Sequence, residues 1–243
     1  MTLEDFAKIL GGDFDFPAAE EYFRGRVPVT RKQFYAIAEE YRALAFTVTN
    51  YSRITVLKAF KDELQKAIDN GTTIQEFRKG MNSFLQDKGY RGITPFQADN
   101  IFRTNVQTAY NVGHYRSMTD PAVMAARPYW QYDAVNDFKT RPSHLAMDGR
   151  VFRADSPVWD EWYPPNGFKC RCGVRSLSAR QVESMGLKVE SQPPGRAELT
   201  DGRVVGIRPD EHFRQNPAKA QWQPDLEGYP PELVAAYRAA NPK

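Results

Sequence analysis

The sequence predicts an α+β fold: a helical N-terminal region, a small α+β domain of short antiparallel strands, and an extended proline-rich tail. Up to about residue 126, apolar residues recur at helical spacing. From Pro128 onward the chain changes to short segments of high aromatic density, which favour strands. From Ser191 prolines and glycines multiply, which favours an extended chain. The predicted boundaries are therefore 1–126, 127–190 and 191–243.

Four helices are predicted in the N-terminal region. Three begin with a capping box, at Thr30, Thr73 and Thr94, and the last of these also has a proline at its first helical position. The second helix ends at an Asn-Gly pair, a usual helix terminator. The four helices are expected to span residues 30 to about 45, 57–70, 73–88 and 94 to about 118. Their inward-facing residues are expected to be Phe34, Ile37, Ala38, Tyr41, Leu44 and Ala45; Leu57, Phe60, Leu64, Ala67 and Ile68; Ile74, Phe77, Met81, Phe84 and Leu85; and Ala98, Ile101, Phe102, Asn105, Ala109 and Val112.

The rest of the chain is expected to alternate short strands with brief helices. A capping box at Ser178 opens a helix that ends at Gly186. One further helix is expected in the tail, at Glu232–Ala240. The predicted strands are Pro128–Val135, Val151–Phe152, Cys172–Leu177 and Leu187–Glu190.

Composition limits the class of protein. Hydrophobic residues make up 41% of the 243 residues, which is enough for a substantial core, and the formal charge of +3 is only mildly basic. Because 33 basic and 30 acidic residues are mixed along the chain, any contact with DNA is expected to be diffuse and electrostatic. No apolar run is long enough to cross a membrane, and the N-terminus does not read as a signal peptide. Two cysteines do not make a disulfide scaffold, so a reducing cytoplasm is the expected setting.

Both cysteines lie close to a histidine and a carboxylate in one stretch of sequence. On an extended strand Cys170 and Cys172 would point to the same face, where two thiolates can share one zinc ion. His144 is the expected third ligand, and Asp148 or Asp137 the fourth. The alternatives are that the thiols are small buried hydrophobes, and that His144 and Asp148 brace the following hairpin by a hydrogen bond.

The turn before the cysteines is read as structural. Pro164-Pro165-Asn166-Gly167 favours a tight turn that aims the cysteine strand back at His144. Catalysis by Asn166 is the alternative.

An ordered set of short motifs also resembles a known family. The set resembles the phage Mu protein F-like family, the minor head or head-morphogenesis proteins of tailed double-stranded DNA phages, most strongly from about Phe96 to Gly186. The resemblance implies a component of the virion or procapsid, formed in the host cytoplasm, that associates with the portal or major head protein and acts in head assembly or DNA delivery. The matching residues are Arg103-Thr104, Tyr110-Asn111, Asp137, Thr140-Arg141-Pro142, His144, Asp148-Gly149, Pro164-Pro165-Asn166-Gly167 and Cys170-Arg171-Cys172.

The fourth helix carries a polar stripe at spacings of three and four residues: Arg103, Gln107, Tyr110 and His114. It is either a solvated face or the surface on which the C-terminal domain docks. Because Arg103 and Tyr110 belong to the matching set, docking is favoured. With Asp137, Arg141 and Asn166, these two residues are expected to support the structure around the candidate site.

Three functions therefore compete. The favoured one is a structural minor capsid protein in which zinc stabilises the fold. The second is a zinc-dependent hydrolase or nuclease that uses His144, Asp148, Cys170 and Cys172, although the His-Glu-x-x-His and deaminase signatures are absent. The third is a cysteine nucleophile paired with His144.

Overall fold

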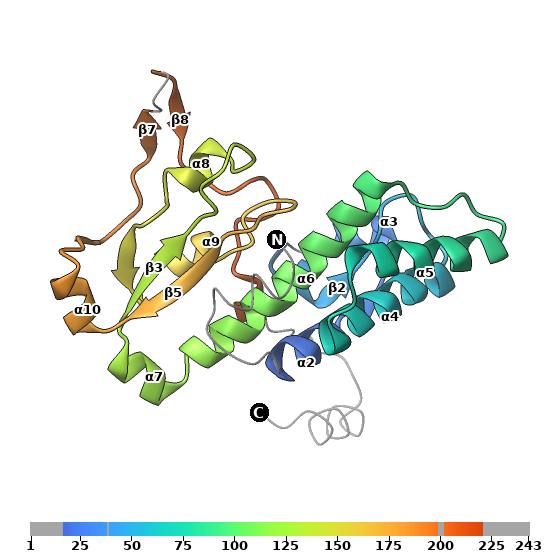
Figure 1. Cartoon of the computed structure of the whole chain (residues 1–243), viewed down its shortest axis with the longest axis horizontal. Coiled ribbons are helices and arrows are strands. Elements are labelled where there is room, and N and C mark those ends of the chain that lie inside the picture. Colours follow the sequence, from blue (N-terminus) through green and yellow to red (C-terminus); the bar gives the residue numbers. More distant parts are fainter. Residues whose placement is uncertain (1–16, 38, 199–201, 221–243) are drawn as a thin grey trace, which may run out of the picture.

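The computed structural model describes residues 17–37, 39–198 and 202–220, and it has the predicted α+β class. Helices α2 to α6 form one half of the molecule and a small sheet with short helices forms the other (Figure 1). The long helix α6 (Pro95–Met118) runs between the two halves. The helix predicted at 232–240 lies outside the described residues.

The helical half confirms three of the four predicted helices. Capping boxes at Thr73 and Thr94 open α5 and α6, and Gly71, in the left-handed conformation at φ 68°, ends α4. An additional helix, α2, was not predicted. Nearly all of the predicted inward residues of α4, α5 and α6 are fully or partly buried in one core, where α2 packs against them. The bounds are α2 Pro17–Gly25, α4 Ile54–Asn70 and α5 Ile74–Asp87.

The first predicted helix, residues 30 to about 45, is wrong beyond its first turns. The capping box at Thr30 is present, but α3 (Arg31–Ala36) ends where Ile37 becomes extended. The guanidinium of Arg42 donates to the carbonyl of Ile37 at 3.1 Å and so holds the break. A 3-10 helix, η1 (Glu39–Leu44), follows, and β2 (Ala45–Phe46) then pairs in parallel with β1 (Val27–Pro28). Long-range strand pairing has overridden local helical spacing here.

The other half is built on a four-stranded sheet of order β5-β3-β4-β6. The central strand β3 is antiparallel to both β4 and β5, as predicted, but β6 pairs with β4 in parallel, so the expectation of purely antiparallel strands is wrong there. Two short helices, α7 and α9, were not predicted. The bounds are α7 Pro121–Ala126, β3 Tyr129–Asp133, α8 Pro142–Leu145, β4 Val151–Arg153, α9 Val158–Trp162, β5 Gly173–Leu177, α10 Ala179–Ser184 and β6 Val189–Glu190.

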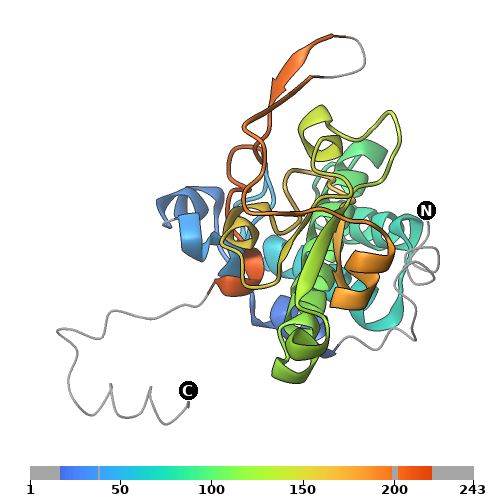
Figure 2. The same cartoon turned by 90° about the vertical axis from the view of Figure 1, so that its left-hand side faces the viewer.

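The described part of the tail is not simply extended. Strands β7 (Arg196–Glu198) and β8 (Val204–Gly206) pair as an antiparallel arm that stands out from the body (Figure 2). The chain then returns to the body and ends its described part in the 3-10 helix η2 (Pro217–Lys219). The Asn216 side chain, 5% exposed, donates to the carbonyl of Trp159 at 3.0 Å, which fastens this segment to α9.

A second core of large aromatic side chains fills the sheet half. Tyr115 of α6 contacts this core edge to face, with ring centroids 4.9 Å from Tyr163 and 5.6 Å from Trp130. Helix α6 therefore contributes to both cores, which places its polar face against the segment that holds the cysteines. The buried aromatic residues of the second core are Trp130, Tyr132, Phe152, Trp159, Trp162 and Tyr163.

Candidate metal centre

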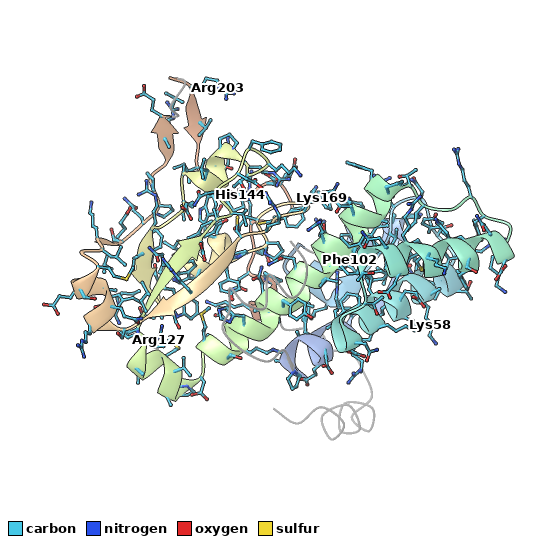
Figure 3. All side chains as sticks on the ribbon, viewed as in Figure 1. Lys58, Phe102, Arg127, His144, Lys169 and Arg203 are labelled. Carbon is cyan, nitrogen blue, oxygen red and sulfur yellow. The ribbon has the colours of Figure 1, made fainter. Side chains whose placement is uncertain are left out.

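The structure brings together three of the four predicted metal ligands. His144 Nδ1 lies 3.7 Å from Cys170 Sγ and 3.6 Å from Cys172 Sγ. The ligand atoms of the three residues all lie within 4.8 Å of one another, and the side chains are only 1–3% exposed. Figure 3 shows His144 by α8, in the sheet half of the molecule. The predicted convergence of these residues is therefore present.

Local chain geometry explains how His144 reaches the thiols. Pro142 occupies the first turn of α8, and Gly149, at φ 74°, turns the chain into β4, which pairs with β3. The Trp162 ring packs edge-on against the imidazole, with 6.3 Å between the two ring centroids. His144 is thus held in a fixed position within the aromatic core.

The cysteines do not lie on a strand, contrary to the prediction. Both precede β5, in a segment where Lys169 has a left-handed backbone at φ 57°. Their sulfurs still face a common side because the buried turn 164–167 orients the segment. A Cβ on Gly167 would meet the ends of the Asp210 and Arg141 side chains, so their ion pair would have to shift.

Asp148 is not part of the group. The geometry therefore does not support Asp148 as a fourth ligand. It does not support the expected hydrogen bond between His144 and Asp148 either. Its two carboxylate oxygens accept from the Ala134 amide and from the Asn136 side chain, each at 2.8 Å. Asp148 therefore braces the loop after β3 against the turn before β4.

Asp137 lies outside the group as well. Its carboxylate forms a two-point ion pair with Arg171, with N–O distances of 2.6 and 2.7 Å, and accepts from the Lys139 amide at 2.9 Å. The hydrogen bonds from Arg171 hold the pKa of Asp137 well below its usual range. Asp137 thus connects the α8 loop to the residue between the two cysteines, a supporting role.

Arg141 and Asn166 fix the turn from its two sides. Arg141 pairs with Asp210 at 2.9 Å and donates to the carbonyl of Phe168 at 2.9 Å. Asn166, fully buried, accepts from the Tyr132 hydroxyl at 2.8 Å through its side chain. Asp210 comes from the proline-rich tail, and no sequence signal connected it with this site.

The polar stripe of α6 docks the sheet half only in part. Gln107 donates to the carbonyl of Cys172 at 3.5 Å, and His114 Nε2 lies 2.9 Å from the carbonyl of Val174. Asn111, which sequence reasoning left out although it is in the matching set, donates to the same Cys172 carbonyl at 3.4 Å.

The other two stripe residues do not act as predicted. Tyr110 is buried in the helical core, so it faces away from the docking surface. Arg103 pairs with Asp99 on its own helix at 2.5 Å, and Asp99 in turn pairs with Lys169 at 2.9 Å. Arg103 therefore approaches the cysteine segment only through Asp99.

Burial and mutual contact shift the pKa values of the two thiols in opposite directions. A hydrogen bond from Cys172, followed by one from His144, lowers the pKa of Cys170 well below its ordinary value despite the burial that opposes this. The hydrogen bond to Cys170 and burial raise the pKa of Cys172. The two thiols therefore titrate as a coupled pair.

The His144 group is closed to larger molecules. A cavity of about 470 Å³ lies between the helical half and residues 212–217, and it is lined by Pro165 and Phe168 but by none of the three cluster residues. His144 Nε2 is buried and has no hydrogen-bond partner. The arrangement can therefore hold a small ion, whereas it offers no approach for a polymer substrate.

Comparison with known proteins gives the family of this region. The family model described as "Phage Mu protein F like protein" matches residues 58–175, which include most of α4, all of α5 and α6, the sheet strands β3 and β4, and all three cluster residues. The chain carries a phage Mu protein F-like region. The resemblance predicted from the motifs is confirmed, although the match begins well before Phe96 and ends before Gly186.

Two curated relatives agree with this match. The Mu-like prophage FluMu F protein of Haemophilus influenzae is 38% identical over 189 residues, which cover 73% of this chain and 45% of the relative. The putative capsid assembly protein F of Escherichia phage Mu is 35% identical over 187 residues, covering 70% and 42%. The chain thus spans less than half the length of these relatives. No solved structure matches the chain significantly.

Among the residues that the structure describes, none of the helices combines the length and apolar character needed to span a bilayer.

Proposed function

We propose that this chain acts in head assembly of a tailed double-stranded DNA phage or prophage, as a minor head component of the virion. The observation that carries the proposal is the Mu F-like match over residues 58–175, together with a phage Mu relative named as a putative capsid assembly protein. A portal or major head protein is the proposed partner. Any contact with DNA would be diffuse, because the net charge is only +3.

The helical half is the proposed contact surface for that partner. Its exposed apolar side chains include Tyr35 at 47% and Ile54 at 49%. Tyr35 lies on α3, where its ring contacts His212 edge to face, and Ile54 is the first residue of α4. Exposed aromatic and aliphatic side chains are typical anchors of protein interfaces.

Co-expression tests this proposal. The tagged chain should co-purify with its cognate portal or major head protein, and Ile54→Glu or Tyr35→Glu should weaken the association. The matched control is Val204→Glu, which changes an equally apolar residue, 62% exposed, on the β7–β8 arm. Failure to associate with either head protein, or with procapsids, would overturn the proposal. If all three variants lose the association equally, the helical half is not the contact surface.

The proposed role is structural and not hydrolytic. The three cluster residues are at most 3% exposed, and both candidate bases are engaged elsewhere, Asp137 by Arg171 and Asp148 by Ala134 and Asn136. A general base must reach the water or proton that it activates. Purified chain should therefore leave DNA and peptidoglycan intact, and cleavage that Cys170→Ser abolishes would favour the zinc hydrolase instead.

A further inference from the structure

The distances within the His144 group match those of ligands around one zinc ion. Zinc bonds sulfur at about 2.3 Å and imidazole nitrogen at about 2.0–2.1 Å, in a tetrahedral arrangement. Those bond lengths at a tetrahedral angle place sulfur and nitrogen about 3.6 Å apart. The structure has 3.7 Å for Cys170 and 3.6 Å for Cys172, both to the same Nδ1 atom. The three atoms are therefore already spaced as a ligand set.

Hydrogen bonding alone explains this arrangement less well. Imidazole Nδ1 has a single lone pair or a single hydrogen, so it can bond well to only one of two thiols. Here both sulfurs lie almost equally far from it, and all three side chains are only 1–3% exposed. The nearly equal distances fit a common centre between the three atoms better than a single hydrogen bond.

We propose that His144 Nδ1 and the Sγ atoms of Cys170 and Cys172 bind one zinc ion that fastens the α8 loop to the segment before β5. Thiolate and imidazole ligands in tetrahedral arrangement suit zinc, whereas carboxylate-rich sites suit magnesium or calcium. Among the described residues, the group contains no fourth histidine, cysteine or carboxylate. The three residues supply three of the four tetrahedral positions.

The ion would connect parts of the fold that are distant in sequence. His144 is separated from Cys170 by 26 residues and from Cys172 by 28. The carbonyl of Cys172 accepts from Gln107 and Asn111 of α6, so the same residue that binds the metal also docks the sheet half on the helix. The metal would thus support the joint between the two halves, a role that does not depend on the proposed head-assembly function.

The wild-type chain gives the first test. Purified under reducing conditions, it should contain one zinc ion per chain by mass spectrometry of the metal. Because the chain has only two cysteines, a mercurial reagent that titrates both thiols should release that ion in step. Cobalt added to the metal-free chain should produce the strong sulfur-to-cobalt absorption of thiolate ligands. X-ray absorption should find two sulfur neighbours and light atoms.

Variants identify the ligands. Cys170→Ser, Cys172→Ser and His144→Gln should each lose most of the zinc, whereas His212→Gln, a change at an exposed histidine, should keep it. A folded wild-type chain that contains no zinc and shows no cobalt–thiolate absorption would overturn the proposal. The wild-type measurements decide the matter even if a ligand variant fails to fold.

Discussion

Asn166 is a buried polar side chain whose partner is also buried. Its Oδ1 accepts from the Tyr132 hydroxyl at 2.8 Å, and neither residue is exposed. Because water cannot replace a missing partner there, an unpaired group would carry the full cost of its desolvation. The turn that presents the cysteines therefore depends on this contact.

Replacing either partner of this hydrogen bond should destabilise the fold. Asn166→Ala and Tyr132→Phe are each expected to lower the free energy of unfolding by about 1–3 kcal/mol, since each breaks a fully buried hydrogen bond. In the double variant both partners of this contact are absent, so the loss should be smaller than the sum of the two. Urea unfolding of the four proteins measures the coupling, and strictly additive losses would show that the contact carries no energy.

His114 links protonation to stability. Burial lowers the pKa of its imidazole below the usual 6.5, against the opposing effect of the Val174 carbonyl. A folded-state pKa below the unfolded one means that the unfolded chain binds the proton first as the pH falls. The stabilisation is therefore complete above pH 6.5 and is lost as the pH falls through the folded value.

Replacing this histidine should make the free energy of unfolding depend less on pH below pH 6.5. His114→Gln keeps a side-chain N–H that can donate to Val174 but no longer titrates, so its free energy of unfolding should fall less than that of the wild type below pH 6.5. Denaturant unfolding at a series of pH values makes the comparison. Parallel curves for the two proteins would count against His114 as a source of the pH dependence.

At the scale of elements, the contact between α2 and α6 depends on one missing side chain. A Cβ on Gly113 would lie 2.9 Å from the backbone nitrogen of Ala19 and 3.3 Å from its Cα. Backbone atoms inside a helix cannot move aside at little cost. Gly113 is thus needed for close helix packing in spite of its poor helix propensity.

Two glycine-to-alanine changes in helices should have opposite effects. Gly113→Ala should destabilise the fold, because overpacking costs about 1–3 kcal/mol whereas helix propensity returns about 1 kcal/mol. Gly80→Ala in α5 should stabilise it by up to about 1 kcal/mol, since its Cβ would meet only the end of the flexible Glu63 side chain. Thermal and urea unfolding measure both, and stabilisation by Gly113→Ala would contradict the proposed close packing.

At the scale of the whole molecule, α6 is the element that the two cores share. If zinc fastens the cysteine segment, its removal should act on the joint between the halves before it acts on the helical half. Chelation should therefore increase hydrogen exchange of the backbone amides at residues 163–177, and of the α6 face that carries Gln107 and His114. Helices α4 and α5, which contact α6 on its other side, are the internal control and should keep their protection. Uniform loss over the chain would instead indicate global unfolding.

Local sequence determined much of this protein. Some signals act within a few residues of the chain, so they can be recognised from the sequence alone. These are the caps at Thr73 and Thr94, the left-handed Gly71 and the apolar spacing of the three long helices. The sheet strands β3 to β5 and the grouping of His144 with the two cysteines were predicted as well.

Only the tertiary structure decided the features that depend on distant partners. The first predicted helix is cut short because β2 pairs with β1 and Arg42 binds the exposed end of α3. Asp148 was a plausible ligand by spacing, yet the loop after β3 occupies both of its oxygens. Asp210 supports the cysteine turn from the tail, and the Cys172 carbonyl meets α6 from more than sixty residues away. Such contacts arise from how the chain packs, and no local pattern encodes which partner a polar side chain will meet.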